Sequence, residues 1–558
     1  MQKTCRQCAT KFEITDEDLK FYDKISPVFA GKKYQIPPPT LCPDCRQQRR
    51  LAFRNERKLY HRKCDFSQKE IISNLSPDKP FKVYEKEIWW SDQWDPLQYA
   101  QDFDFSRPFF EQWRELQLKV PKINLFSKGG ENVAYTNHAT YNKDCYMLFN
   151  ATQCNNVHYT TNYVIKCNNC IDCYSIENCE LLYNSFLCEN CYGSKDLVYS
   201  KNCSNSNFLY DCRSCNDCTM SYGLRNKKYC YQNKQYTKED YEAIIKKLDL
   251  GNYGNYKTAQ DEFKEMIKYK AIHRYAIIDQ SENCTGDYVI QSKDTFDSYY
   301  AIKCRDSRYL YDSYGHNTSY DSYESALECE LQYECYACNF GKNMKFCHVS
   351  QESHDMYYTD YCFNSHDLFG CIGLKRKSYC ILNKQYSKEE YEKLAPQIIE
   401  HMQRHGEWGE NFPMKYAPFA YNESVANEFY TLTEQQVKEQ GLNWERSDTL
   451  NRYQGEKINI PGNIKNVDDD ILKSILACDH CGKNYKLIHQ ELKFYRELKV
   501  PIPRFCFECR HQKRLEYRNP RKLWQRNCTK CGTTIQTSYS PDRPEMVYCD
   551  GCYLKEVY

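Results

Sequence analysis

Cysteine pairs separated by two residues stand at both ends of this 558-residue chain. Two pairs follow one another at each end: Cys5, Cys8, Cys42 and Cys45, then Cys478, Cys481, Cys506 and Cys509. This spacing lets both thiolates of a pair reach one metal ion, and two pairs complete a tetrahedral zinc site. Because four protein ligands leave no open coordination position, the pattern predicts structural and not catalytic zinc.

A further set of four cysteines lies in the C-terminal part: Cys528, Cys531, Cys549 and Cys552. The N-terminal part aligns with it through SPDKPFKVY and SPDRPEMVY, and retains only the first cysteine, Cys64. Ser67, Glu85 and Ile88 stand in place of the other three. One thiol cannot complete a four-ligand site. We therefore predict three zinc ions, one N-terminal and two C-terminal, and a core position for Cys64.

The middle of the chain is duplicated as well. GLRNKKYCYQNKQYTKEDYE from Gly223 recurs 150 residues later as GLKRKSYCILNKQYSKEEYE from Gly373. Cysteines recur at spacings of nine and 21, beside phrases of Asp, a small residue and Tyr. A period near 20 of short strand-like runs predicts a mainly β fold with short helices, in which zinc ribbons flank a duplicated cysteine- and tyrosine-rich β-solenoid, like a parallel β-helix. An irregular cysteine-rich meander is the alternative.

The central cysteines invite a metal interpretation, but packing explains them better. At the offset of 150 residues, Cys170 matches Tyr320 and Cys173 matches Tyr323. Metal ligands are not expected to change to tyrosine between copies, whereas packing positions can. Free cysteine behaves as a small buried hydrophobic residue. We expect stacked core thiols, with extra metal or an iron–sulfur cluster as the alternative.

These patterns divide the chain into seven segments. They are an N-terminal zinc ribbon (1–64), a linker with an amphipathic helix (65–130), repeat module 1 (131–250), a helical linker (251–280), repeat module 2 (281–400), an irregular connector (401–473) and a C-terminal double zinc ribbon (474–558). Capping-box patterns at Thr237 and Ser387 predict that a helix closes each repeat module.

Charge and cysteine use indicate the compartment. Lys and Arg number 77 against 75 Asp and Glu, so no overall field attracts nucleic acid or a membrane. The first residues contain no apolar stretch, and no apolar run is long enough to span a bilayer. Without an export signal, cysteines favour thiols and metal ligands over disulfides. We expect a cytoplasmic protein with no membrane partner.

The terminal segments resemble a known domain. A CxxC pair, a helix ending in LKFY, a proline-containing loop and then CPxCR or CFECR with a basic tail are similar to the zinc-ribbon domain of many small bacterial proteins. The resemblance covers about residues 1–64 and 474–528, and the N-terminal copy has a longer loop around SPVFAGKKY. The order of ribbon, cysteine-rich repeats and ribbon is similar to a bacterial protein family. The resemblance implies zinc and no particular reaction.

A basic stretch with aromatic residues follows each second cysteine pair. Its candidate phosphate contacts are Arg46, Arg49, Arg50, Arg54 and Arg57, then Arg510, Lys513, Arg514, Arg518 and Arg521. Guanidinium groups bind phosphates and aromatic rings stack on unpaired bases, so RNA or DNA is a candidate partner. Contact with another protein, or a solvated helix whose arginines pair with the chain's own acids, explains the same pattern.

No catalytic constellation stands out. The sequence has no evident nucleophile and base, phosphate-binding loop or paired acids in a defined setting. The 13 histidines are scattered, and we expect them at the surface. The sequence therefore favours a non-enzymatic zinc-binding scaffold that binds nucleic acid or a ribonucleoprotein. A protein-assembly scaffold and a carbohydrate-binding or carbohydrate-active β-helix are the alternatives.

Overall fold

A computed structural model describes residues 1–324, 326–337, 342, 344–446 and 458–558. The chain forms two compact units. Unit 1 joins Met1–Leu125 to Ala276–Glu445, and unit 2 joins Phe126–Tyr275 to Arg446–Tyr558. The N-terminal module (residues 1–64) thus belongs with the second repeat (281–400). The C-terminal module (474–558) belongs with the first repeat (131–250).

Strands dominate both units, with twelve short α-helices among the described residues. The first part of unit 1 contains β1 (Gln2–Thr4), β2 (Lys11–Glu13), α1 (Asp16–Ile25), β3 (Val28–Phe29), β4 (Lys32–Lys33), α2 (Pro43–Ala52), β5 (Tyr60–Lys63), β6 (Glu70–Ser73), β7 (Val83–Tyr84), α3 (Lys86–Trp90), α4 (Phe109–Lys119) and β8 (Lys122–Ile123). Its second part contains β23 (Ile278–Asp279), β24 (Gly286–Ile290), β25 (Lys293–Phe296), β26 (Ser298–Ile302), β27 (Arg305–Asn317), β28 (Tyr320–Tyr323), β29 (Ala326–Glu330), β30 (Gln332–Tyr333), β31 (Met344–Lys345), β32 (His354–Tyr357), β33 (His366–Phe369), β34 (Ser378–Ile381), β35 (Lys384–Gln385), α7 (Lys388–Arg404), α8 (Ala426–Phe429) and α9 (Glu434–Glu439).

Unit 2 begins with the first repeat and ends with the C-terminal module. The first part contains β9 (Ser127–Lys128), β10 (Asn137–Thr140), β11 (Tyr146–Thr152), β12 (Asn155–Ile165), β13 (Asn168–Ile171), β14 (Tyr174–Glu177), β15 (Glu180–Tyr183), β16 (Phe186–Glu189), β17 (Tyr192–Val198), β18 (Asn207–Tyr210), β19 (Asn216–Tyr222), β20 (Lys228–Tyr231), β21 (Lys234–Gln235), α5 (Lys238–Leu248), α6 (Tyr253–Tyr269) and β22 (Ile272–Arg274). The second contains β36 (Leu476–Ala477), β37 (Asn484–Tyr485), α10 (His489–Glu497), α11 (Phe507–Leu515), β38 (Trp524–Asn527), β39 (Thr534–Thr537), β40 (Met546–Tyr548) and α12 (Asp550–Val557).

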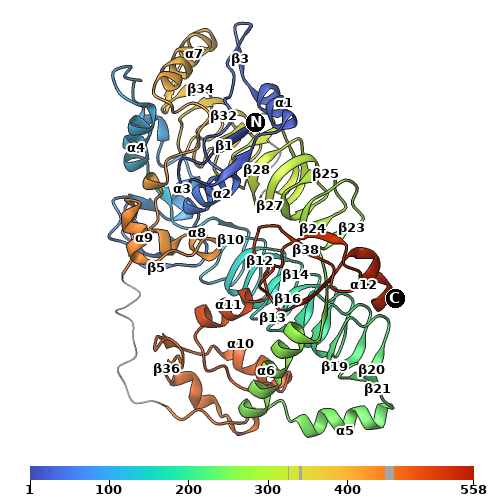
Figure 1. Ribbon diagram of the computed structural model, residues 1–558. Helices are drawn as coiled ribbons and strands as arrows, with labels where there is room; N and C mark the ends of the chain where they lie inside the picture. Colours follow the sequence, from blue (N-terminus) through green and yellow to red (C-terminus); the bar gives the residue numbers. More distant parts are fainter. Residues whose placement is uncertain (325, 338–341, 343, 447–457) are drawn as a thin grey trace. The chain divides into compact units, whose positions relative to one another are not determined.

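In both repeats, strands pair in parallel with residues about twelve positions further along the chain. Asn137 pairs with Phe149, and Glu180 pairs with Tyr192. Figure 1 shows the strands of the first repeat, coloured teal to green, lying one beside the next. Pairings among β12, β13, β15, β17, β16 and β14 close a ring of six strands. The period of about 20 expected from the cysteine spacing is therefore wrong, and the chain advances by twelve residues.

A three-residue unit underlies this period. In the first repeat a left-handed backbone recurs at every third residue from Asn132 to Asn162, and again from Tyr163 to Gln232. In Asp172-Cys173-Tyr174, Asp172 has this backbone with φ of 58°, and Cys173 is fully buried. Asp and Asn tolerate left-handed backbone better than most residues. In the Asp, small residue and Tyr phrases of the sequence, the Asp therefore occupies the left-handed corner, the small residue points inward and the Tyr follows it. A cysteine spacing of nine residues corresponds to three of these three-residue units.

The central cysteines of the first repeat lie in its core, as the packing interpretation predicts. All thirteen between Cys145 and Cys230 belong to one cluster of buried residues. Their thiols contact backbone carbonyl groups: the Sγ of Cys167 lies 3.3 Å from the oxygen of Ile165 and 3.4 Å from that of Ile176. A small side chain with a weak donor suits an interior lined by strand carbonyls.

The alignment of the two repeats at an offset of 150 is locally wrong. Each repeat contains a register shift at a different place, between β11 and β12 in the first and between β27 and β29 in the second. Between these points the offset is 149, so Cys170 aligns with Ser319 and Cys173 with Ser322. Cys170 Sγ and Ser319 Oγ each lie 3.1 Å from the carbonyl oxygen two residues earlier. Small residues therefore replace small residues at the inward positions.

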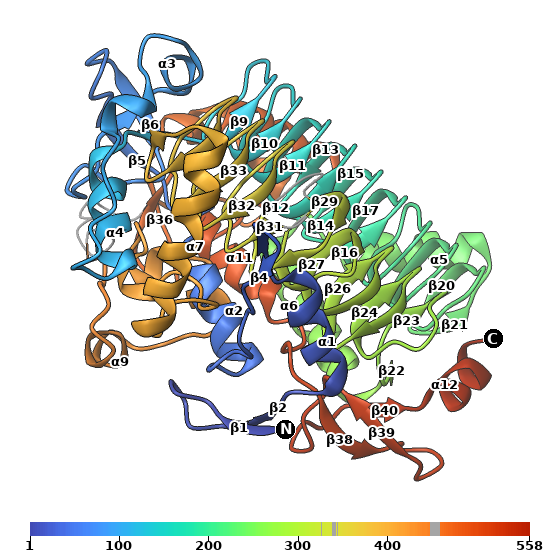
Figure 2. The same ribbon diagram turned by 90° about the horizontal axis from the view of Figure 1, so that it is seen from above.

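Helices close the repeats where the sequence predicts them. Thr237 caps α5, and Ser387 forms a complete capping box with Glu390 at the start of α7. In unit 1, α2 lies beside the strands of the second repeat near β28 (Figure 1). Figure 2 shows β24, β26 and β27 of that repeat lying one beside the next. In unit 2, the ring of Phe507 in α11 packs against that of Tyr159 in β12. No helix in the described part of the chain has the length and apolar content to cross a membrane.

Candidate metal centres and the arginine clusters beside them

Within the described residues, three groups of four thiols converge as candidate metal centres. They are Cys5, Cys8, Cys42 and Cys45; Cys478, Cys481, Cys506 and Cys509; and Cys528, Cys531, Cys549 and Cys552. In each group all four Sγ atoms lie within 4.8 Å of one another. One contact in each is 3.6 Å, between the second and third cysteines. Zn–S bonds of about 2.3 Å place tetrahedral sulfur atoms about 3.8 Å apart, so the groups fit such a metal.

Local backbone structure delivers the ligands of each centre. The third cysteine is the N-cap of a helix, and the fourth lies in its first turn: Cys42 caps α2, Cys506 caps α11 and Cys549 caps α12. The partial positive charge of a helix N-terminus stabilises thiolates. The first pair sits in a tight turn closed by a residue with positive φ, which is Gly482 (71°) or Gly532 (76°) in the C-terminal module.

Hydrogen bonds favour the thiolate form of some ligands. The bond with Cys45 lowers the pKa of Cys42 to about 5. Bonds with the side chain and backbone of Thr533 lower the pKa of Cys531 to about 6. Hydrogen bonds with these two thiols raise the pKa of the partner thiols Cys45 and Cys552, because one proton is shared within each pair. Cys42 and Cys531 are therefore the ligands that ionise first in their groups, and the thiolate is the metal-binding form.

Cys64 lies at the position in the N-terminal module that corresponds to Cys528, the first ligand of the third four-thiol group. The amide of Gln68 donates to the Cys64 carbonyl at 2.9 Å, as Gly532 does to Cys528. The amide of Glu85 contacts Cys64 Sγ at 3.3 Å, and the Cys549 amide contacts Cys528 Sγ at 3.2 Å. The turn has therefore kept its shape with a single thiol, and Cys64 is fully buried, as expected.

A matched pair of substitutions tests this difference. Cys64→Ala should leave the metal content unchanged and destabilise unit 1 by on the order of 1 kcal/mol, as a small core truncation does. Cys528→Ala should remove one metal ion per chain because a ligand is lost. Native mass spectrometry and thermal unfolding measure both effects. Loss of metal from Cys64→Ala would contradict the assignment.

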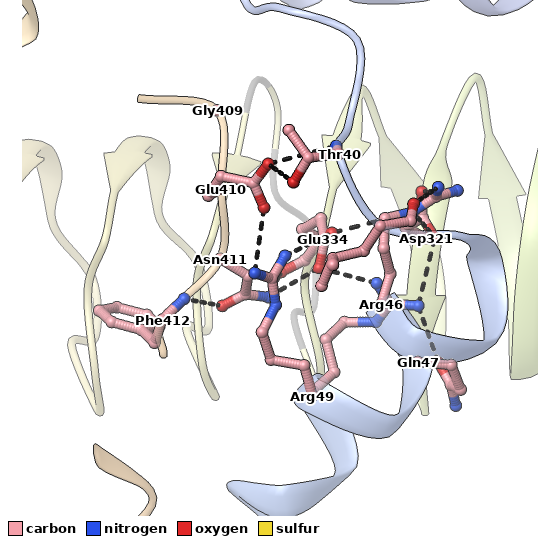
Figure 3. Close-up of polar contacts among 12 residues, drawn as sticks. Thr40, Arg46, Gln47, Arg49, Asp321, Glu334, Gly409, Glu410, Asn411 and Phe412 are labelled. Carbon is pink, nitrogen blue, oxygen red and sulfur yellow. Dashed lines mark hydrogen bonds and ion pairs between the residues drawn. The ribbon is translucent and has the colours of Figure 1, made fainter. Parts of the chain in front are cut away.

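The arginines beside the first centre are buried against acids of the second repeat and of the connector that follows it (Figure 3). Arg46 is 1% exposed, and its Nε and Nη2 lie 3.0 Å from Oδ1 and Oδ2 of Asp321, respectively. Arg50 Nη1 donates to Glu334 Oε2 at 2.8 Å, and Arg49 Nη1 donates to Glu410 at 3.1 Å. Burial alone would raise the pKa of Glu334, but the three arginines outweigh it and lower that pKa. The bonds to Asp321 and Glu334 attach the N-terminal module to the second repeat, and the bond to Glu410 attaches it to the connector.

Unit 2 repeats the arrangement with fewer acids. Arg510 Nε lies 2.9 Å from Asp172 Oδ2, and Arg514 Nη1 donates to Asp172 Oδ1 at 3.1 Å. Glu491 of α10 lies 3.6 Å from Arg510 Nη2. Asp172 is 1% exposed. The C-terminal module is therefore attached to the first repeat through the same two helix positions.

Most residues predicted to contact nucleic acid point into the protein. The buried side chains are Arg46, Arg49, Arg50, Arg54, Arg510, Arg514 and Arg521. The partly buried ones are Arg57, Lys513 and Arg518. Arg54 pairs with Glu324 and Arg57 with Glu428. The basic stretches that motivated the nucleic-acid prediction are therefore largely buried, and binding to nucleic acid stays a prediction.

The acids that receive the arginines were missed in the sequence. Asp172 and Asp321 both stand in Asp, small residue and Tyr phrases, which we interpreted only as a repeat signal. These two acids stand at matching positions of the two repeats, and the arginine-bearing helices are duplicated as well. This shared duplication is the signal that could have predicted that the acids pair with the arginines.

The prediction of surface histidines is wrong for several of them. His348 is 1% exposed, with Nδ1 3.3 Å from Asp360, and His273 is 2% exposed. His273 Nδ1 lies 2.7 Å from the Tyr210 hydroxyl, and its Nε2 lies 2.8 Å from the Ile267 carbonyl oxygen. Hydrogen bonds to the ring nitrogens offset the free-energy cost of burying a neutral imidazole.

Burial also makes His273 a source of acid sensitivity. Desolvation lowers the pKa of His273 to about 4 from 6.5. Its contribution to stability is complete above pH 6.5 and is lost as pH falls towards 4, because only the unfolded chain binds the proton readily. The loss should amount to about 3 kcal/mol. Urea unfolding of unit 2 at several pH values should show a flatter profile for His273→Gln, with His489→Gln, at an exposed position of the same unit, as control. Equal slopes would contradict this prediction.

Comparisons with known proteins add little. No family model and no curated protein matches the chain. Among solved structures, a "putative acetyltransferase from Desulfovibrio desulfuricans G20" aligns at 9% identity, covering 50% of this chain and 81% of its own, with a TM-score of 0.10. That likeness carries no argument about fold or activity.

Proposed function

We propose that this protein is a non-enzymatic, zinc-stabilised scaffold made of two similar units. Each unit is a zinc ribbon docked on a β-solenoid with turns of about twelve residues. The parallel pairing at twelve-residue intervals and the inward position of every third side chain support the solenoid. The thiolate sets and their Sγ spacing support zinc, because a closed tetrahedral set of four sulfurs suits zinc.

One observation carries the proposal: a metal ligand and a docking arginine are adjacent in each ribbon. Cys45 precedes Arg46, and Cys509 precedes Arg510. The metal would fix the first turn of α2 or α11, and that turn aims the guanidinium group at Asp321 or Asp172. Zinc would therefore stabilise both the ribbon and its attachment to the repeat.

Among the partners expected from the sequence, a protein suits this scaffold better than a nucleic acid. Buried guanidinium groups engaged by carboxylates are not available to phosphate backbones. A reducing compartment such as the cytoplasm suits a chain that gathers twelve cysteines in four-thiol groups and packs thirteen more in one buried core cluster.

Metal analysis of the purified full chain tests the proposal. We expect three zinc ions per chain and no iron. Six or more metal ions would mean that the central cysteines also bind metal. Iron absorption bands would show that the chain holds an iron centre and not zinc. As a control, Cys284→Ser, in the second repeat, should leave the count at three.

A further inference from the structure

A cleft in unit 2 lies beside the arginine cluster of α11. It is lined by the first repeat, α6 and the C-terminal module. Its cationic lining residues are Lys257, Lys264, Arg504, Arg510, Lys513 and Arg514. Asp261, which pairs with Lys257, is the one carboxylate among the described lining residues, and the rings of Tyr253, Phe505 and Tyr517 contribute apolar walls. Such a surplus of positive charge beside aromatic rings favours an anionic ligand.

Arg514 has unused donors at this cleft. It is 1% exposed, and its Nη1 binds Asp172. Among the described residues, its Nε and Nη2 have no hydrogen-bond partner. Buried donors of a charged group are normally satisfied, and leaving them unpaired costs free energy. In unit 1 the Nε of Arg50, at the same helix position, is unpartnered as well, whereas its Nη2 donates to Gln47. The Nη2 of Arg514 is therefore the donor left for a carboxylate or phosphate.

The neighbouring lysines add to the positive field. Lys513 Nζ lies 3.6 Å from the centre of the Phe505 ring. Burial, together with Lys264 and Lys257, lowers the pKa of Lys513, as expected where cations crowd one another. Lys264 pairs with Glu516 at 2.6 Å.

The equivalent place in unit 1 already contains a carboxylate. In unit 2 the ring of Tyr183 lies 5.6 Å from that of Tyr495 in α10. In unit 1 the ring of Tyr333 lies 5.5 Å from that of Tyr22, which occupies the same position in α1. The next residues, Asn184 and Glu334, are therefore equivalent, and both have left-handed backbone, with φ of 48° and 54°. Glu334 places its carboxylate 2.8 Å from Arg50, the counterpart of Arg514.

Asn184 supplies no such charge to Arg514. Its side-chain amide donates instead to Asp196, which does not line the cleft. We propose that the unit 2 cleft binds a small organic anion whose carboxylate or phosphate group takes the place that the Glu334 carboxylate fills in unit 1. The aromatic walls would contact the rest of the ligand, and guanidinium groups bind either head group through two donors.

Calorimetric titration of the full chain with phenyl phosphate and with benzoate tests this proposal. We expect saturable binding of one equivalent, and the tighter probe identifies the preferred head group. Asn184→Glu should supply the carboxylate from within and weaken binding by about tenfold or more, while raising the unfolding temperature of unit 2. Failure of both probes to bind the wild type would overturn the proposal.

Two lysine substitutions keep the test decisive if Asn184→Glu folds poorly. Lys513→Met, at the cleft, should weaken binding by about tenfold, which corresponds to one lost charge-assisted contact. Lys268→Met, an exposed position of α6 outside the described lining, should leave affinity unchanged. Equal affinities of the two variants would overturn the proposal.

Discussion

Cys509→Ser is expected to remove one metal ion from the chain and to unfold the ribbon that carries α11. A four-thiolate zinc site contributes on the order of 10–16 kcal/mol to folding at neutral pH, which matches or exceeds the whole stability of a typical domain. Without the metal, α11 loses its anchored first turn, and Arg510 loses the orientation that brings it to Asp172. Hydrogen exchange should then show lost protection in α10 and α11.

The equivalent change in unit 1, Cys45→Ser, should have the same effect on α2 and leave α11 protected. Cys284→Ser serves as the matched control because Cys284 is a half-buried thiol of the second repeat and lies outside the three four-thiol groups found among the described residues. Retention of three metal ions by Cys509→Ser would contradict the assignment of this centre. So would loss of metal without loss of protection in α11.

Asp172→Asn should destabilise unit 2 by about 3–5 kcal/mol, because it leaves buried guanidinium groups uncompensated. Arg514 would be left without a carboxylate contact among the described residues, since Asp172 is the acid that its Nη1 binds. Asp321→Asn should cost less in unit 1, because Glu334 still binds Arg50. Urea unfolding monitored by hydrogen exchange in α11 and α2 separates the two units.

An exposed ion pair provides the control for these substitutions. Lys388 and Glu392 lie 3.8 Å apart on the surface of α7, and Glu392→Gln should change stability by less than about 0.5 kcal/mol. If Asp172→Asn behaves like Glu392→Gln, the buried arginine cluster is not what attaches the C-terminal module to the first repeat.

The metal centres were predictable in full as residue sets because their information is local. The two ligands of each pair are separated by two residues, and a helix capped by Cys42 or Cys506 follows directly. The repeat period was not predictable to the same degree. Cysteine fills only some of the inward positions, and Ser, Leu and Val fill others, so its spacing samples multiples of the three-residue unit and hides the unit itself.

The arginine stretches show the opposite limit. Their charge and helical location were evident, but their exposure was assumed. A guanidinium group on a helix can face solvent or a buried acid with the same local sequence, and the choice depends on what packs against the helix. Arg46 and Asp321 are separated by 275 residues, so no local pattern connects them.

The sequence by itself determined which thiols form the three candidate metal centres, where the duplications lie, and that Cys64 stands alone. These properties depend on spacing and on internal repetition, which are written in the chain. The tertiary structure alone decided that each terminal module packs on the repeat more distant from it in sequence, and that Asp172 and Asp321 receive the arginines. It also decided that Asn184 leaves Arg514 open where Glu334 binds Arg50. The physical reason is that burial and pairing of charges depend on which distant surfaces meet.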